Sequence, residues 1–233
     1  PERFKALLRT IYARGKITAK VRVNGTLSKS ECRVTHAVLE TTSHGLAQHR
    51  VDASQYDASQ YDVAIVTNIT HEHLDQHGSY ENYRAAKGRL FQLLEITSPK
   101  PQGNPRLAVL NRDDSSFEYL SSLIHSLQSV NCISYGIDSK ADIYADHIVH
   151  SPRGIQFEAV GVDFRVPVNS PLVGEFNILN CLGALGAAVG GLGISPELAA
   201  GGIATMTGVP GRMEAIDLGQ PFLAIVDFAH TPN

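Results

Sequence analysis

Short apolar runs alternate with segments of helical periodicity along most of this chain. The runs at 35–40, 63–66, 107–110, 132–135 and 222–226 predict strands, most of them buried, because each is too short for a buried helix. Helices are expected where apolar residues recur at helical spacing, over 2–13, 79–94, 115–127 and 177–191, and again after Pro196. Strands and helices in alternation indicate an α/β fold with a mostly parallel sheet flanked by helices.

The pattern changes between residues 141 and 168, where apolar residues alternate with polar ones. Ile155 and Phe157 are typical of this stretch, and Gly154 and Gly161 interrupt it. Alternation of this kind predicts an antiparallel meander or a set of hairpins. We therefore expect a small antiparallel β portion beside the parallel sheet.

Polar clusters follow three of the predicted strands, at Glu40, at 68–77 and at 227–230. In open α/β sheets, ligands bind outside the carboxyl ends of the strands, so three clusters at one edge would line one crevice. The middle cluster holds three histidines and two carboxylates, a combination that suits a divalent cation such as Mg²⁺ or Mn²⁺. The alternative is a polar loop with ordinary surface histidines.

Composition narrows the choice of partners. With 20 basic and 23 acidic residues the net charge is −3, which indicates neither a nucleic-acid partner nor a membrane-surface partner. The three cysteines are scattered, which argues against a disulfide framework and a structural zinc site. No signal peptide and no apolar run of membrane-spanning length is visible, so a soluble protein of a reducing compartment is expected.

Other candidate residues are ambiguous by themselves. Lys87 lies beside apolar positions on the helix after the histidine cluster, where a lysine with a solvated head is the simpler interpretation. Asn177 and Asn180 share one face of a helix start, and Asn177 could be an N-cap. Arg212 stands in a rigid Gly/Pro loop, where it could bind a phosphate or serve solubility.

Taken together, these motifs resemble the Mur ligase family, and within it the UDP-N-acetylmuramoyl-tripeptide synthetases (MurE). They occur in family order and cover most of the chain beyond Thr35. Any one of the motifs is weak, whereas six in order are highly specific. The matching pieces are 40–51 (ETTSHGLAQHRV), 67–78 (TNITHEHLDQHG), 81–87 (ENYRAAK), 174–180 (GEFNILN), 208–214 (GVPGRME) and 227–233 (DFAHTPN).

The resemblance implies the central, P-loop-NTPase-like ATP-binding domain of an ATP-dependent ligase of peptidoglycan precursor synthesis. A carboxylate of a UDP-N-acetylmuramoyl-peptide would be converted to an acyl phosphate, which the amine of a free amino acid then attacks. The implied cofactors are ATP and Mg²⁺, or Mn²⁺, and the implied location is the cytoplasm. A monomer is expected, with no nucleic-acid or membrane partner. The central domain would cover residues 1–218, and the C-terminal ligase domain would begin at 219–233.

The resemblance also implies roles for individual residues. Glu40 and His73 would be magnesium ligands, and Lys87 would be the carbamylated lysine that presents a carboxylate to a second cation. Lys87 and His73 would thus serve catalysis. The nucleotide-sugar substrate would contact Thr42, Ser43, Gln48 and Arg50, whereas ATP would contact Asn177, Asn180, Arg212 and Asp227.

The chain also departs from the family pattern. The phosphate loop is not recognisable, and Gly15-Lys16-Ile17-Thr18 matches its end only by chance. We expect the sequence to be a portion of a longer ligase. The alternatives are a related amide ligase of the cyanophycin or folylpolyglutamate synthetase type, or a non-catalytic nucleotide-binding fragment. A local duplication, Asp-Ala-Ser-Gln-Tyr at 52–56 and 57–61, has no known counterpart.

Overall fold

The structure, a computed structural model, divides the chain into two compact units. The smaller unit comprises Pro1–Ser59 and His73–Leu90, and the larger comprises Gln60–Glu72 and Phe91–Asn233. For 7–13, 17–23 and 74–75 the backbone alone is described. The residues described are 7–13, 17–23, 36, 38–51, 61–70, 74–101, 103–138, 140–206, 208–216 and 218–228.

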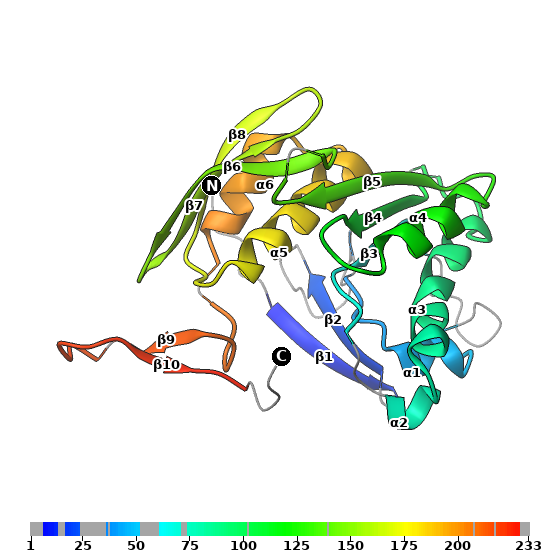
Figure 1. Cartoon of the computed structure of the whole chain (residues 1–233), viewed down its shortest axis with the longest axis horizontal. Helices are drawn as coiled ribbons and strands as arrows, with labels where there is room; N and C mark the ends of the chain where they lie inside the picture. The colour runs from blue at the N-terminus through cyan, green and yellow to red at the C-terminus, as the bar shows by residue number, and fades with distance from the viewer. Residues whose placement is uncertain are drawn as a thin grey trace, which may run out of the picture. The chain divides into compact units, whose positions relative to one another are not determined.

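The larger unit is built on a six-stranded sheet with the order β3-β4-β5-β6-β7-β8 (Figure 1). Its first four strands are parallel, and β6, β7 and β8 are antiparallel neighbours. Both the mostly parallel sheet and the antiparallel portion are confirmed, the second as a continuation of the first. The strands are β3 (Val63–Val66), β4 (Leu107–Asn111), β5 (Asn131–Gly136), β6 (Ile143–Ser151), β7 (Gly154–Val160) and β8 (Arg165–Ser170).

The strand β4 is buried along its whole length because helices pack against it. The helix α5 (Phe176–Leu185) continues into a π-helical segment, Gly186–Gly191. Its glycines permit close approach: a Cβ added to Gly191 would lie 2.5 Å from Val63 Cγ2. The small-residue helix predicted over 177–191 is thus confirmed, with a π-helical end.

The other helices of this unit follow their sequence signals. The helix α4 (Phe117–His125) packs on β4 and β5, and α6 (Pro196–Ala204) packs on β8. Ser195 caps α6, since its Oγ accepts a hydrogen bond of 3.3 Å from the amide of Leu198. The proline at the first helical position suits the missing N–H there.

The predicted buried strand at 222–226 is only partly correct. The strand β10 (Ala224–Val226) pairs with β9 (Glu214–Ile216) in a separate two-stranded antiparallel sheet. Ile225 is 42% exposed and Val226 is 47% exposed, so the strand is not buried. Its apolar residues matched the pattern of a core strand, but burial is set by the partner strand and not by the run itself.

The smaller unit contains β1 (Leu7–Ala13) and β2 (Ile17–Val23), which pair antiparallel. The helix predicted over 2–13 is therefore wrong for residues 7–13. Strand pairing satisfies the backbone of this segment and overrides its helical spacing. The unit also holds α1 (Ser43–Ala47), α2 (Leu74–His77) and the first part of α3 (Tyr80–Glu95), which extends into the larger unit.

The strand predicted at 35–40 is contradicted. Residues 36 and 38–40 are not in a strand, and Val38 is 67% exposed. Glu40 therefore does not end a buried strand, and the expected row of three polar clusters at one sheet edge is wrong as stated. Of the three, the described start of the cluster at 68–77 follows a strand of the six-stranded sheet, β3. In the described residues, every helix is too short or too polar to cross a lipid bilayer.

Candidate active site

The helix α1 begins at a capped turn of polar residues. Thr42 precedes it with extended backbone angles, and its Oγ1 accepts a hydrogen bond of 3.1 Å from the amide of Gly45. Ser43 follows as the first helical residue and is 5% exposed. Two of the predicted substrate-binding residues therefore form the N-terminus of one helix, although Thr42 serves at least partly as its cap.

His77, which was not among the predicted site residues, contacts Ser43. Ser43 Oγ lies 3.0 Å from His77 Nε2, and Asn82 Nδ2 donates a hydrogen bond of 3.0 Å to the carbonyl of His77. The His77 ring lies 5.1 Å from the rings of both His44 and Tyr83, measured between centroids. The signal for His77 was present in the sequence, as one of the histidines in the cluster after β3.

Lys87 lies on α3 one turn after Tyr83 and is half-buried. Its Nζ lies 5.3 Å from the centroid of the Tyr83 ring, a cation–π distance. Ser43, His77, Tyr83 and Lys87 thus form a continuous series of side-chain contacts within the smaller unit. The predicted substrate residue Ser43 and the predicted carbamylated lysine stand at its two ends.

The predicted cation ligands are described only in part. Glu40 is exposed, and His73 lies outside the described residues. An exposed carboxylate and a lysine that carbamylation would turn into a carboxylate are oxygen donors, which Mg²⁺ prefers. Glu40 therefore offers a donor that suits this cation, and Lys87 would offer one once carbamylated. Both residues belong to the smaller unit.

The segment after α1 presents the other predicted substrate residues. Gln48 and Arg50 are exposed, and the amide of Arg50 donates a hydrogen bond of 2.9 Å to the carbonyl of Gly45. Between them, His49 has a positive φ of 56° and its ring nitrogens contact the guanidinium of Arg89 at 2.8 and 3.2 Å. The contact between His49 and Arg89 joins this turn to α3. The side chains of Gln48 and Arg50, on either side of His49, are exposed.

Asn177 and Asn180 contact each other at the start of α5. Asn180 Nδ2 donates to Asn177 Oδ1 at 3.0 Å, and Asn177 Nδ2 donates to the carbonyl of Val173 at 2.7 Å. Asn177 is 6% exposed, whereas Asn180 is exposed. The buried amide therefore orients the exposed one, and Asn180 is the member of the pair that faces solvent.

Arg212 and Asp227 are also brought into one local structure. Asp227 Oδ2 accepts a hydrogen bond of 2.6 Å from the amide of Met213, the residue after Arg212. Gly211 donates to Glu214 Oε2 at 2.8 Å and accepts from the amide of Phe228 at the same distance. These bonds join the Gly/Pro loop to the end of β10. Arg212 and Asp227, both predicted to bind ATP, therefore lie in two segments that are hydrogen-bonded to each other.

The sequence-based predictions did not include the polar turn at the end of β4. Like the predicted clusters, it directly follows an apolar strand. Asn111, Asp113 and Asp114 follow the predicted strand at 107–110 directly. Asn111 Nδ2 donates to the carbonyl of Thr67 at 2.8 Å, and Asp114 Oδ2 accepts from the amide of Ile69 at 3.3 Å. The turn therefore holds the described part of the segment that leads to His73.

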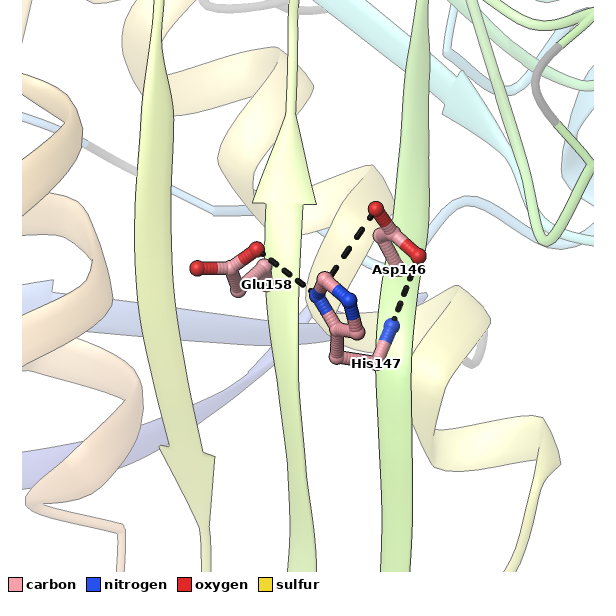
Figure 2. Close-up of side chains that lie close together, drawn as sticks. All are labelled: Asp146, His147 and Glu158. Atoms are coloured by element: carbon pink, nitrogen blue, oxygen red, sulfur yellow. Dashed lines mark hydrogen bonds and ion pairs between the residues drawn. The ribbon is translucent and has the colours of Figure 1, made fainter.

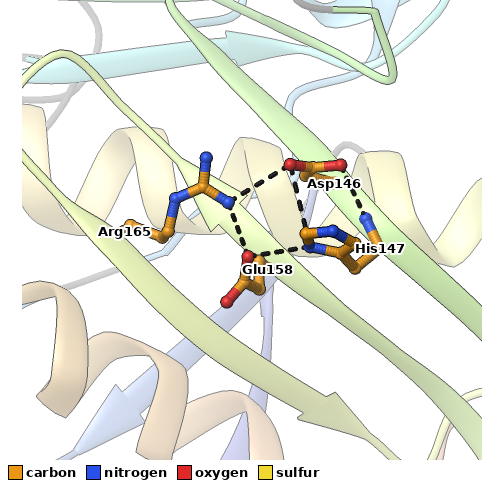
Figure 3. A network of polar contacts seen from close by, with 4 residues as sticks. All are labelled: Asp146, His147, Glu158 and Arg165. Atoms are coloured by element: carbon orange, nitrogen blue, oxygen red, sulfur yellow. Dashed lines mark hydrogen bonds and ion pairs between the residues drawn. The ribbon is translucent and has the colours of Figure 1, made fainter.

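A second cluster of charged side chains lies on β6, β7 and β8, in a place the sequence did not indicate. Figure 2 shows His147 between two carboxylates, with Nδ1 at 3.0 Å from Glu158 Oε2 and 3.7 Å from Asp146 Oδ2. Arg165 Nη1 contacts the same two oxygens at 2.5 and 3.2 Å (Figure 3). A cation at these carboxylates would have to compete with the guanidinium, so we interpret the cluster as an ion-pair network.

This network shifts the pKa values of Asp146, Glu158 and Arg165. Hydrogen bonds from His147 and Arg165 lower the pKa of Glu158. Hydrogen bonds from the Arg165 side chain and the His147 backbone lower the pKa of Asp146, and both carboxylates in turn raise the pKa of Arg165. His147 has a positive φ of 49° and sits where the β6–β7 register shifts, so the network pins an irregular stretch of the sheet.

The Mur ligase middle domain matches residues 4–188. The chain belongs to the Mur ligase family. Its similarity to individual Mur ligases extends over most of the chain but over less than half of each relative.

Two curated relatives carry the name UDP-N-acetylmuramoyl-L-alanyl-D-glutamate–2,6-diaminopimelate ligase. The protein of Solibacter usitatus (strain Ellin6076) is 40% identical over 201 residues, which are 85% of this chain and 37% of the relative. That of Geobacillus thermodenitrificans (strain NG80-2) is 38% identical over 200 residues, 86% of this chain and 38% of the relative. The chain thus spans less than two fifths of the length of these Mur ligases.

Solved structures agree with the fold. A UDP-N-acetylmuramoyl-L-alanyl-D-glutamate–2,6-diaminopimelate ligase superimposes with a TM-score of 0.67 at 31% identity, covering 83% of this chain and 37% of that protein. MurF from Acinetobacter baumannii gives a TM-score of 0.61 at 25% identity, over 72% of this chain and 34% of that protein. FPGS of L. casei shares the fold alone, with a TM-score of 0.59 at 16% identity over 76% of this chain and 41% of that protein.

Proposed function

We propose that this chain is the ATP-binding middle part of a ligase that adds an amino acid to a UDP-N-acetylmuramoyl-dipeptide in cytoplasmic peptidoglycan precursor synthesis. The observation that carries the proposal is the 38–40% identity, over 85–86% of the chain, to ligases named for 2,6-diaminopimelate. Because the chain spans 37–38% of those relatives, the activity is assigned to the complete ligase that contains it. Residues 1–218 would form the central domain, and the C-terminal domain would begin within 219–233.

The smaller unit would carry the catalytic and substrate contacts. Bound ATP would supply the phosphoryl group for an acyl phosphate, and Mg²⁺ or Mn²⁺ would neutralise charge on the phosphates. Glu40 and His73, together with Lys87 in its carbamylated form, would hold the cations. The exposed side chains of Gln48 and Arg50 and the α1 N-terminus at Thr42 and Ser43 would bind the anionic nucleotide-sugar substrate.

The larger unit would carry the nucleotide contacts. Asn180, oriented by the buried Asn177, offers an exposed amide to a purine base. Arg212 offers a guanidinium to phosphate, and Asp227 offers a carboxylate to a ribose hydroxyl. These roles agree with the local structures that bring the members of each pair together.

The test is an assay of phosphate release by the complete ligase. The protein is incubated with ATP, Mg²⁺ and UDP-N-acetylmuramoyl-L-alanyl-D-glutamate, and 2,6-diaminopimelate, lysine and other amino acids are added one at a time. We expect phosphate release that needs both the nucleotide sugar and one amino acid, together with a product whose mass has grown by that amino acid. Reactions without the nucleotide sugar are the control.

The remaining alternatives give different results in the same assay. Release with a folate or with a cyanophycin primer, but not with the nucleotide sugar, would replace the proposal with a related amide ligase. Binding of ATP without any substrate-dependent release would indicate a nucleotide-binding protein without catalysis. The shared fold of FPGS does not favour the first, because at 16% identity it concerns architecture alone.

A further inference from the structure

The helix α1 ends in a turn with a well-defined set of backbone hydrogen bonds. Gln48 is the C-cap residue, and the amide of His49 donates to the carbonyl of Leu46 at 3.2 Å. The amide of Arg50 donates to the carbonyl of Gly45 at 2.9 Å. These two bonds, with His49 at a positive φ of 56°, form the Schellman motif, which satisfies the last carbonyl groups of a helix.

The residue at the left-handed position of this motif is a histidine, where glycine is the usual residue. Glycine adopts a positive φ without strain because it has no Cβ, whereas a larger residue costs conformational energy there. Residues in such sparsely populated conformations persist where the surrounding contacts hold them. His49 therefore needs side-chain contacts that offset this strain.

The ring of His49 contacts the guanidinium of Arg89 on α3. Nδ1 lies 2.8 Å from Nη2, and Nε2 lies 3.2 Å from Nη1. A guanidinium has donors only and a neutral imidazole has one acceptor nitrogen, so one of the two contacts is a hydrogen bond. We assign it to Nδ1, which makes the shorter contact. Both residues belong to the smaller unit, and Arg89 is a firm anchor because it is half-buried, with its Nε shielded from solvent.

This contact lies between the two predicted substrate residues of the turn. Gln48 and Arg50 precede and follow His49, and both are exposed, so burial does not fix their side chains. On either side of this exposed stretch the chain is held in the core, at Leu46 with 1% exposure and at Val51 with 5%. The contact with α3 adds a fixed point in the middle of the stretch.

We infer that Arg89 and His49 are positioning residues for the nucleotide-sugar substrate: Arg89 holds the turn through the His49 ring and thereby orients Gln48 and Arg50. The inference rests on the proposed function for the identity of the substrate, whereas the contact between the two side chains is independent of it. Neither positioning residue touches the substrate in this role. A turn that is ordered beforehand loses less conformational entropy when the substrate binds, so the contact contributes to affinity.

Two substitutions at His49 separate the backbone of the turn from its side chain. His49→Gly suits the positive φ and removes the acceptor. His49→Asn also tolerates this backbone, and it offers a side-chain oxygen the same number of bonds from the backbone as Nδ1. In the complete ligase we expect His49→Gly to raise the KM for UDP-N-acetylmuramoyl-L-alanyl-D-glutamate about three- to tenfold, with kcat and the KM for ATP unchanged. His49→Asn should raise it less than about twofold.

Arg89→Met removes the other partner and keeps an unbranched side chain on the helix. Its matched control is Arg84→Met, because Arg84 is also a half-buried arginine of α3 but its guanidinium lies over the Tyr80 ring, 5.4 Å from the centroid. We expect Arg89→Met to raise the same KM about three- to tenfold and Arg84→Met to leave it unchanged. An unchanged KM in either His49→Gly or Arg89→Met, or an equal rise in Arg84→Met, would overturn the inference.

A second readout does not depend on catalysis. Amide hydrogen exchange at Arg50 should become at least about threefold faster in Arg89→Met, which leaves the sequence of the turn unchanged, and should stay the same in Arg84→Met. If the unmodified ligase neither binds nor uses the nucleotide sugar, the proposed function is wrong. The anchoring of the turn is then decided by exchange: faster exchange in Arg89→Met alone would support it, and equal exchange in the two variants would reject it.

Discussion

Ser43 Oγ and His77 Nε2 lie 3.0 Å apart, and this contact joins the first residue of α1 to the last residue of α2. We expect the two side chains to be coupled in stability. In a double-mutant cycle of Ser43→Ala and His77→Phe, which keeps an aromatic ring, the coupling free energy should be about 1 kcal/mol. Urea denaturation measures it. Ser43→Ala combined with Thr205→Ala, a substitution in the larger unit, should be additive. Additivity in the pair Ser43→Ala and His77→Phe would contradict the contact.

Lys87→Ala is expected to abolish ligation, because a residue without the amine cannot be carbamylated, and bicarbonate should not restore it. The matched control is Lys100→Ala. Lys100 is also half-buried, in an ion pair of 2.6 Å with Asp62, and its loss should reduce stability by up to about 1 kcal/mol while turnover is kept. Carbon-13 NMR after labelling with ¹³CO₂ should show a carbamate that is missing in Lys87→Ala. Normal turnover in that variant would remove Lys87 from the site.

Replacing Asn177 should mainly lower the stability of the protein, whereas replacing Asn180 should mainly weaken nucleotide binding. Asn177→Ala removes a buried side chain and leaves the partly buried carbonyl of Val173 without its partner, so it should destabilise the protein by about 1–3 kcal/mol. Asn180→Ala removes an exposed amide and should weaken binding of a non-hydrolysable ATP analogue about three- to tenfold with little loss of stability. Calorimetry of ligand binding and thermal unfolding separate the two effects. A larger loss of stability in Asn180→Ala would invert the assignment.

The ion-pair network around Arg165 should make stability depend on pH in the acid range. Hydrogen bonds with Arg165 and His147 hold the pKa of Asp146 and that of Glu158 below their ordinary values. These carboxylates therefore contribute stability above their unfolded-state pKa values and lose it as pH falls through their folded-state pKa values. Arg165→Gln should therefore flatten the loss of stability below about pH 4.5. Thermal unfolding between neutral and acid pH measures it. Arg153→Gln on the neighbouring exposed turn is the control, and an unchanged acid slope in Arg165→Gln would count against the network.

Much of the six-stranded sheet could be predicted from sequence, for a physical reason. Strands such as 63–66 and 107–110 are uninterrupted apolar runs, which a sheet covered on both faces requires. The antiparallel part at 141–168 was equally legible, because one half-buried face imposes alternation. In both regions one periodicity dominates the sequence, and the predicted strands were confirmed.

The predictions failed where a partner outside the segment decides the structure. Residues 7–13 have helical spacing but pair with 17–23, and Ile225 has the character of a core residue but lies on an exposed hairpin. The contact between Asn177 and Asn180 followed from their spacing of three residues at a helix start. The bond from Asp114 to Ile69 spans 45 residues, and no local pattern reveals a contact of that range.

The two halves of the sheet differ in how far apart in sequence their paired strands lie. Residues 152–153 connect β6 to β7 and residues 161–164 connect β7 to β8, whereas the chain between β3 and β4 includes the whole of α3. Short loops lose less conformational entropy when they close. We therefore expect β6, β7 and β8 to pair early through local contacts, and β3 to pair with β4 later. Pulse-labelled amide exchange during refolding should therefore protect Phe157 before Ile65, and the opposite order would contradict this. The edge strand β3, which leads into the polar segment 67–70, is then the last part of the sheet to form.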